Sequence, residues 1–325
     1  MPRPCALAVL LSVAACGCHA PPSCKGVCVS PSLSRLDLVA GQPGGPGWVD
    51  AVGAAAHFAD PWTFAGDGAG KLYLIDGSII RAIDEVSSSV TTLAGTPGVI
   101  GADNGVGPAA SFNSPGGLTL VGGTLYVCDS ENEAIRAIDV ASATVTTYAG
   151  ALGQAGAADG DLATARFLAP EGIVGDGAGN LYVADAENHT LRKIALATGT
   201  VTTLAGAAGV PGNVDGIGAA ARFYKPKSLA LDGAGHLFVA DSLNESIRTV
   251  TLADASVTTL ASFALPPIGV AVAGADVFAS TSDHRVVRIT PSGVTTTLAG
   301  QLGMSGFVDG AAADARFFRP AGLWV

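Results

Sequence analysis

The sequence predicts an all-β fold: a β-propeller of six blades, each of four antiparallel strands, with an incomplete last blade. Three observations predict it: a repeated phrase, short runs rich in β-branched and aromatic residues, and glycine-rich turns between those runs. The phrase Thr-Thr-(Leu/Tyr)-Ala-Gly recurs with its alanine at positions 94, 149, 205 and 299, and positions 40 and 261 keep the register. Repeated units that cannot bury both faces alone are typical of propellers.

The third repeat shows how one blade is built. It reads PEGIVGDGAGNLYVADAENHTLRKIALATGTVTTLAG. We expect strands at 172–175, 181–185, 190–196 and 201–204, separated by turns at 176–179 and 198–199. The repeat that ends at position 299 has only 38 residues, so four strands suffice for a unit. The longer repeats carry an insert of roughly 18 residues before their first strand.

Three stretches carry a resemblance to a known family. GTLYVCDSENEAIRAI, GNLYVADAENHTLRKI and GHLFVADSLNESIRTV look like NHL repeats, the second with Asn188-His189 and Leu191. The resemblance covers about residues 33–325 and implies a propeller, usually of six blades. The first repeat, DGSIIRAI, is shorter and lacks the Asn, and the fifth, ASTSDHRVVRI, departs further.

The two ends of the repeat region predict how the ring closes. Residues 34–39 precede Ala40-Gly41 and are expected to supply the fourth strand of the last blade. The final repeat reaches only the start of its first strand, at positions 320–325. This predicts an open edge in a truncated reading frame, with a tolerated gap or closure by five blades as alternatives.

The N-terminus predicts export. Residues 1–15 combine Arg3 with an apolar run too short to span a bilayer, as in a signal peptide. Val-Ala-Ala-Cys at 13–16 resembles the bacterial lipoprotein signal, which implies lipidation of Cys16, a tether over 16–32 and a place in the outer membrane or at the cell surface. Cleavage after Ala20 and secretion is the alternative. A disulfide among Cys18, Cys24 and Cys28 is possible. Cys128 stands where other repeats have Ile75, Ala184 and Ala240 and is expected to be a small buried filler.

Charge narrows the classes of partner. The chain has 27 acidic and 17 basic residues. Arg3 and Lys25 are the only charged residues of the first 30, so the remainder has 15 basic residues and a net charge of −12. We therefore expect no nucleic-acid binding and membrane contact only through the lipid. No cofactor or metal motif is present, and Cys-x3-Cys without nearby His is a weak zinc signal.

An ion-pair ladder is predicted at the ends of the second and third strands. An Asp and an Arg recur there together, and in blade five both change, to Ser280 and Val287. Joint loss indicates that the two side chains pair and fix strand register. The predicted ladder residues are Asp76, Arg81, Asp129, Arg136, Asp185, Arg192, Asp241 and Arg248.

The inserts and the loops between strands two and three share one face, which we call the long-loop face. Propellers commonly bind partners there. In the inserts, an Arg follows seven residues after Asp159, Asp215 and Asp309. We expect the Asp to cap a turn. The Arg is expected either to pair with this Asp or to join a ring of arginines at the channel mouth. Calcium is the alternative reading, but each loop offers few carboxylates. The candidate ligand-binding residues are Arg166, Glu171, Asn188, His189, Arg222 and Lys227.

The sequence indicates activity only weakly. We expect a non-catalytic scaffold that binds a protein, peptide or glycan on the long-loop face, without a cofactor. The alternative is a lyase or a lactonase-like hydrolase with its site in the central channel. A His-ligated metal would need convergent histidines, yet His236 is expected on the opposite face from His57, His189 and His284.

Overall fold

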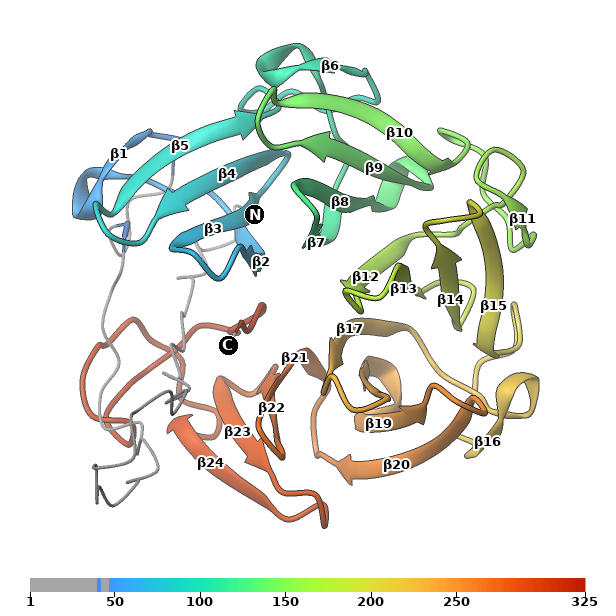
Figure 1. Cartoon of the computed structure of the whole chain (residues 1–325). Helices are drawn as coiled ribbons and strands as arrows, with labels where there is room; N and C mark the ends of the chain where they lie inside the picture. The colour runs from blue at the N-terminus through green and yellow to red at the C-terminus, as the bar shows by residue number, and fades with distance from the viewer. Residues whose placement is uncertain (1–39, 42–46, 325) are drawn as a thin grey trace, which may run out of the picture.

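Five antiparallel β-sheets stand around a central channel as the blades of a propeller (Figure 1). The computed structural model describes residues 40–41 and 47–324. The predicted signal peptide, Cys16 and the tether lie outside the described residues and stay predictions. Over the described part of the chain, no helix has the length and apolar character needed to cross a membrane.

Each blade runs from an innermost strand at the channel to an outer strand at the rim. Blade one comprises β2 (Pro61–Gly66), β3 (Lys71–Asp76), β4 (Ile79–Asp84) and β5 (Ser89–Ala94). Blade two comprises β7 (Pro115–Val121), β8 (Thr124–Asp129), β9 (Ala134–Asp139) and β10 (Thr144–Gly150). Blade three comprises β12 (Pro170–Gly175), β13 (Asn180–Asp185), β14 (Thr190–Ala195) and β15 (Thr200–Gly206). Blade four comprises β17 (Pro226–Leu231), β18 (His236–Asp241), β19 (Ser246–Thr251) and β20 (Ser256–Ser262). Blade five comprises β21 (Pro267–Ala273), β22 (Asp276–Thr281), β23 (Arg285–Ile289) and β24 (Thr295–Gly300).

The inserts add a fifth strand to four of the sheets. Their two-residue strands β1 (Ala51–Val52), β6 (Gly105–Val106), β11 (Gly160–Asp161) and β16 (Gly216–Ile217) pair with the outer strand of the blade that follows each insert. Blade five has no insert and keeps four strands. The prediction of six four-stranded blades is therefore wrong. The described chain forms five complete sheets, and four of them have five strands because the insert reaches the rim and pairs with the outer strand.

Short 3-10 helices complete the regular structure. Three follow the added strands in the inserts: η1 (Gly53–Ala55), η2 (Gly107–Ala109) and η4 (Gly218–Ala220). Two others, η3 (Ser130–Asn132) and η5 (Ser242–Asn244), form the loop between the second and third strands of their blades.

The sixth position of the ring is occupied by segments from both ends of the described chain. Gly322 N donates to Trp62 O at 2.8 Å, which attaches residues 320–324 to β2. Gly41 N donates to Gly53 O at 3.1 Å. The equivalent hydrogen bond after blade one runs from Gly95 N to Gly107 O. Residues 301–324 hold only isolated bridges and no strand. Ala40-Gly41 therefore takes the place expected at the end of a fourth strand, beside blade one.

The core lies between neighbouring blades, because each sheet buries apolar side chains on both faces. One cluster joins Tyr182 and Leu191 of blade three to Leu237 and Val250 of blade four. Cys128 is fully buried in the cluster between blades two and three, and desolvation raises the pKa of its thiol well above the usual value. This environment is that of the small buried filler expected from the repeats.

Candidate functional site

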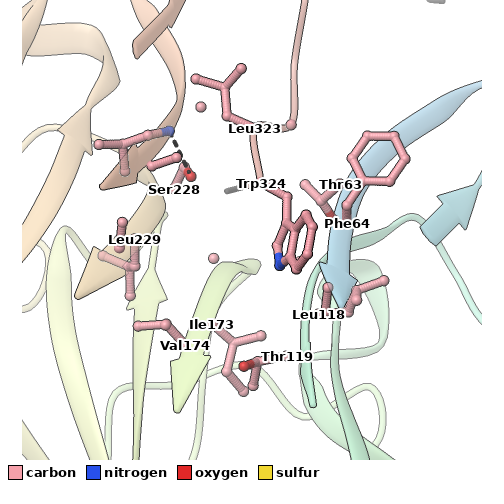
Figure 2. Close-up of a pocket in the computed structure, with 18 of the residues that line it drawn as sticks. Thr63, Phe64, Leu118, Thr119, Ile173, Val174, Ser228, Leu229, Leu323 and Trp324 are labelled. Carbon is pink, nitrogen blue, oxygen red and sulfur yellow. Dashed lines mark hydrogen bonds between the residues drawn. The ribbon is translucent and has the colours of Figure 1, made fainter. Parts of the chain in front are cut away.

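The central channel contains a cavity of about 280 Å³. Its wall is made by the five innermost strands and by residues 321–324, so each sector of the ring contributes (Figures 1 and 2). The innermost strands are the last strands of their sheets, and one backbone edge of each faces the channel rather than another strand of its sheet. Unpaired N–H and C=O groups on such edges are available to a ligand.

Glycines set the diameter of the channel. A Cβ on Gly172 would lie 2.2 Å from Lys227 O, and one on Gly117 would lie 2.4 Å from Glu171 O. Gly269 is equally restricted by Ala321 O, at 2.1 Å. Neighbouring innermost strands therefore approach so closely that a side chain at these positions would push two blades apart.

The residues that follow the first proline of each innermost strand form the mouth of the channel at the long-loop end. They differ from blade to blade: Trp62, Gly116, Glu171, Lys227 and Ile268, with Ala321 in the sixth position. Lys227 Nζ lies 3.1 Å from Glu171 Oε2, and about a quarter of each side chain is exposed. These two are the ionisable residues in the cavity wall described here. The mouth thus carries one opposite-charge pair among uncharged neighbours.

Trp324 lies deeper in the channel. Figure 2 shows its indole within the ring of innermost strands. The indole packs against Gly66, where a Cβ would lie 2.2 Å from Cζ2, and against the cluster that contains Phe64. The channel therefore has an aromatic residue near its mouth, Trp62, and another further in.

Arg166 and Arg222 do not form an arginine ring at the channel mouth, which was one of the two alternatives expected for the insert arginines. Arg166 Nη1 donates to the carbonyls of Ala163 and Ala165, and Arg222 makes the equivalent bonds to Ala219 and Ala221. Neither side chain lines the cavity. Of the four charged residues among the ligand-binding candidates, Glu171 and Lys227 lie in the cavity wall.

Asn188 and His189 are buried in the loop after β13. Asn188 Nδ2 donates to Asp185 Oδ2 at 2.8 Å and to Gly156 O at 2.7 Å. His189 Nδ1 lies 3.0 Å from Ala186 O and 3.3 Å from Lys225 N, so it donates to the first or accepts from the second. Neither residue lines the cavity. Their contacts join the loop to the insert and to the next blade.

The structure brings the ladder residues together in four blades. Within the ladder, the Arg nitrogen and Asp oxygen are 2.9 Å apart for Arg81 and Arg248, 2.7 Å apart for Arg136 and 2.8 Å apart for Arg192, and all eight side chains are fully buried. Each guanidinium also lies 5.0–5.4 Å from the ring centroid of an insert phenylalanine. Burial outweighs the hydrogen bonds in its effect on Asp185 and raises the pKa of that carboxyl to about 6.

The acidic residue of the insert pairs with the ladder arginine, not with the insert arginine. Arg192 Nη2 donates to Asp159 Oδ1 at 2.8 Å, and Asp159 also accepts from Thr203 N and Oγ1. Asp50, Asn104 and Asp215 hold the same position in the other inserts. Sequence reasoning missed this contact. The signal was present in the spacing, because each insert residue precedes its ladder arginine by 31–33 residues.

Blade five departs from the ladder at a different residue from the one predicted. Thr281 pairs with Pro267 across the strands, as Asp241 pairs with Pro226, so Thr281 and not Ser280 replaces the aspartate. Val287 replaces the arginine, as predicted, because it opposes Ala279 where Arg248 opposes Val239. Ser280 Oγ instead donates to Ala321 O at 2.6 Å and ties blade five to the sixth position.

No three His, Cys, Asp or Glu side chains within the described residues converge as metal ligands do. His284 Nδ1 accepts from Arg319 N at 3.0 Å, whereas His236 Nδ1 lies 2.6 Å from Asp232 Oδ2 in the turn before β18. The carboxylate of Asp159, considered above as a calcium ligand, is already bound to Arg192 and Thr203.

Comparison with known proteins agrees with the repeat pattern and the ring. No protein-family model matches the sequence. NHL repeat-containing protein 2 from Bos taurus is 27% identical over 276 residues, 69% of this chain and 38% of that protein. The human protein of that name is 30% identical over 182 residues, 48% of this chain and 25% of its own length. The chain is a β-propeller whose repeats are similar to those of NHL repeat-containing proteins.

Other similar proteins show how far the likeness extends. Suppressor of quenching 1 from Arabidopsis thaliana is 36% identical over 160 residues, 46% of this chain and 15% of that protein. The chain spans 15–38% of these curated relatives. Among solved structures, the nidogen/laminin complex gives a TM-score of 0.55 at 17% identity and covers 73% of this chain and 79% of that one. Virginiamycin B lyase from Staphylococcus aureus gives a TM-score of 0.50 at 16% identity and covers 73% of this chain and 69% of that one. These structures share the fold.

Proposed function

We propose that this NHL-repeat propeller is a non-catalytic binding scaffold that takes a protein, peptide or glycan on its long-loop face. The observation that carries the proposal is the channel mouth. There the innermost strands present a different residue from each blade around a single Glu171–Lys227 pair. A binding site needs such variation, because identical repeats present identical chemistry to every ligand.

The composition of the wall favours binding over catalysis. A propeller enzyme with its site in the channel would need a general base, a nucleophile or metal ligands facing the cavity. Glu171 is the single carboxylate of the described wall, and Lys227 already lies within contact distance of it. The nidogen/laminin structure gives a precedent for a propeller of this fold in a protein complex.

A peptide selection tests the binding function. The purified full chain is used to select from a phage-displayed dodecapeptide library, with the Glu171→Gln/Lys227→Met double variant as counter-selection. We expect peptides whose affinity falls about tenfold or more in that variant. The matched control is Glu187→Gln/Lys225→Met, which removes a 2.6 Å surface pair outside the cavity wall. Enrichment that is equal on all three proteins would contradict binding at the mouth.

The enzyme alternative is tested on the same preparations. Dihydrocoumarin and phenyl acetate serve as lactone and ester probes. Turnover that disappears in Glu171→Gln but persists in Glu187→Gln would replace the scaffold with a channel enzyme. We expect no turnover above that of the buffer.

We further propose that the propeller works outside the cytoplasm, attached to a membrane through lipid on Cys16. The motif at positions 13–16 and the apolar run before it support this location. The acidic chain supports a membrane contact through the lipid alone, since an excess of carboxylates is repelled by anionic lipid surfaces.

A further inference from the structure

We propose that the channel cavity binds a small zwitterion: an α-amino acid with an uncharged side chain. This adds a small-molecule site to the macromolecular partner proposed above. The two proposals share one premise, that the channel mouth is a binding site.

The charges of the wall select for a zwitterion. Glu171 and Lys227 are adjacent in the ring, of opposite sign, and the only ionisable residues of the described wall. A ligand with one charge would bind one partner and leave the other desolvated without a counter-charge. A ligand with an ammonium and a carboxylate on one carbon replaces both halves of the pair, with its ammonium on Glu171 and its carboxylate on Lys227.

The pair can open at little cost. Its side chains are 29% and 25% exposed, and partly exposed ion pairs contribute little to stability. Lys225 is already bound to Glu187 at 2.6 Å, so it does not compete for the ligand carboxylate. The neighbours of Glu171 and Lys227 at the mouth are Gly116 and the apolar Ile268, which leaves the two charged groups without a second charged partner in the wall.

The size and composition of the cavity select for a small ligand with an uncharged side chain. A cavity of about 280 Å³ lies at the lower end of the range of small-molecule sites. Trp62 belongs to β2, which lies across the channel from β17, the strand that carries Lys227 (Figure 1). Leu120, Leu231 and Trp324 are half-buried further along the wall. An aliphatic or aromatic side chain of the ligand would contact apolar residues in this part of the wall, which contains no charged residue.

Matched ligands test the charge requirement. L-phenylalanine is compared with 3-phenylpropionate, which lacks the ammonium, and with 2-phenylethylamine, which lacks the carboxylate. L-leucine is compared with 4-methylpentanoate and 3-methylbutylamine in the same way. Binding to the full chain is measured by calorimetry and by the fluorescence of its tryptophans. We expect at least one amino acid to bind about tenfold or more tightly than both of its singly charged analogues.

Matched variants test the site. We expect Glu171→Gln and Lys227→Met each to weaken amino-acid binding about tenfold or more, and Glu187→Gln to leave it unchanged. Three results would overturn the inference: singly charged analogues that bind as tightly as the amino acids, either variant binding amino acids as tightly as the unsubstituted chain, or no binding up to about 10 mM ligand. Selected peptides that bind the mouth while amino acids do not would overturn this inference and leave the scaffold proposal standing.

Discussion

Arg192 joins Asp185 of its own blade to Asp159 of the insert, with a separation of 2.8 Å to each carboxylate. The same guanidinium lies 5.1 Å from the centroid of the Phe167 ring. One buried cation therefore determines strand register and holds a long surface loop against the rim. Blades one and four repeat the double pairing through Asp50 and Asp215, and blade two uses Asn104 as the insert partner.

Removing the ladder cation should strongly destabilise the fold. Arg192→Met leaves the buried Asp185 without its counter-charge, and we expect a loss of about 3–5 kcal/mol in the free energy of unfolding. Guanidinium denaturation measures it. Arg222→Met is the control, because that side chain bonds only to carbonyls of its own turn; it should cost about 0.5–1.5 kcal/mol.

The pairing of Asp185 with Arg192 should appear as coupling between two substitutions. Asp185→Thr together with Arg192→Met copies blade five, where Thr281 and Val287 hold these positions. We expect the double variant to lose less free energy of unfolding than the two single variants lose in sum. The difference should exceed about 0.5 kcal/mol. Simple additivity would contradict the pairing.

Stability should fall as the pH rises through the range in which Asp185 ionises. Burial raises the pKa of Asp185 to about 6, above the value near 4 of an unfolded chain. Between these values the native state binds more protons, so its free energy of unfolding falls from about pH 4 to pH 6. Denaturation at several pH values measures the slope. Asp185→Asn should reduce it, and an unchanged slope would contradict the raised pKa.

The insert should detach when its acidic residue is removed. Asp159→Ala eliminates the bonds to Arg192 and Thr203, so we expect faster amide exchange over residues 150–167. Hydrogen exchange detected by mass spectrometry measures this. Asp161→Ala is the control, because Asp161 bonds within its own turn, to Ala163 and Thr164. Equal exchange in both variants would mean that Asp159 does not hold the insert.

A single methyl group at the channel should separate two blades. The Cβ of Gly172→Ala would lie 2.2 Å from Lys227 O, so we expect a loss of roughly 1–3 kcal/mol. Thermal denaturation measures it. Gly47→Ala, whose Cβ would meet its nearest atom at 3.6 Å, should be nearly neutral. Similar losses in the two variants would refute close strand approach as the cause.

The proposed lipid attachment can be tested by expressing the full chain in a bacterium. Cys16→Ser should shift the full chain from the membrane fraction to the soluble fraction and abolish labelling by a fatty-acid precursor, because it removes the thiol proposed to carry the lipid. Fractionation with detergent phase separation measures this. Unchanged partitioning of the variant would exclude lipid on Cys16 and favour the secreted alternative.

The repeating blade and its ladder can be predicted from the sequence alone. Strand-like runs, glycine turns and the joint recurrence of residues such as Asp185 and Arg192 are local or periodic signals, and they can be read without knowing how blades contact one another. Tertiary structure decided the partners of the inserts, since Asp159 meets Arg192 only when the insert folds back over the rim. It also separated Arg166 from Glu171 and paired Glu171 with Lys227. These contacts join segments that lie far apart in the sequence, so they depend on how the inserts and the blades pack against one another.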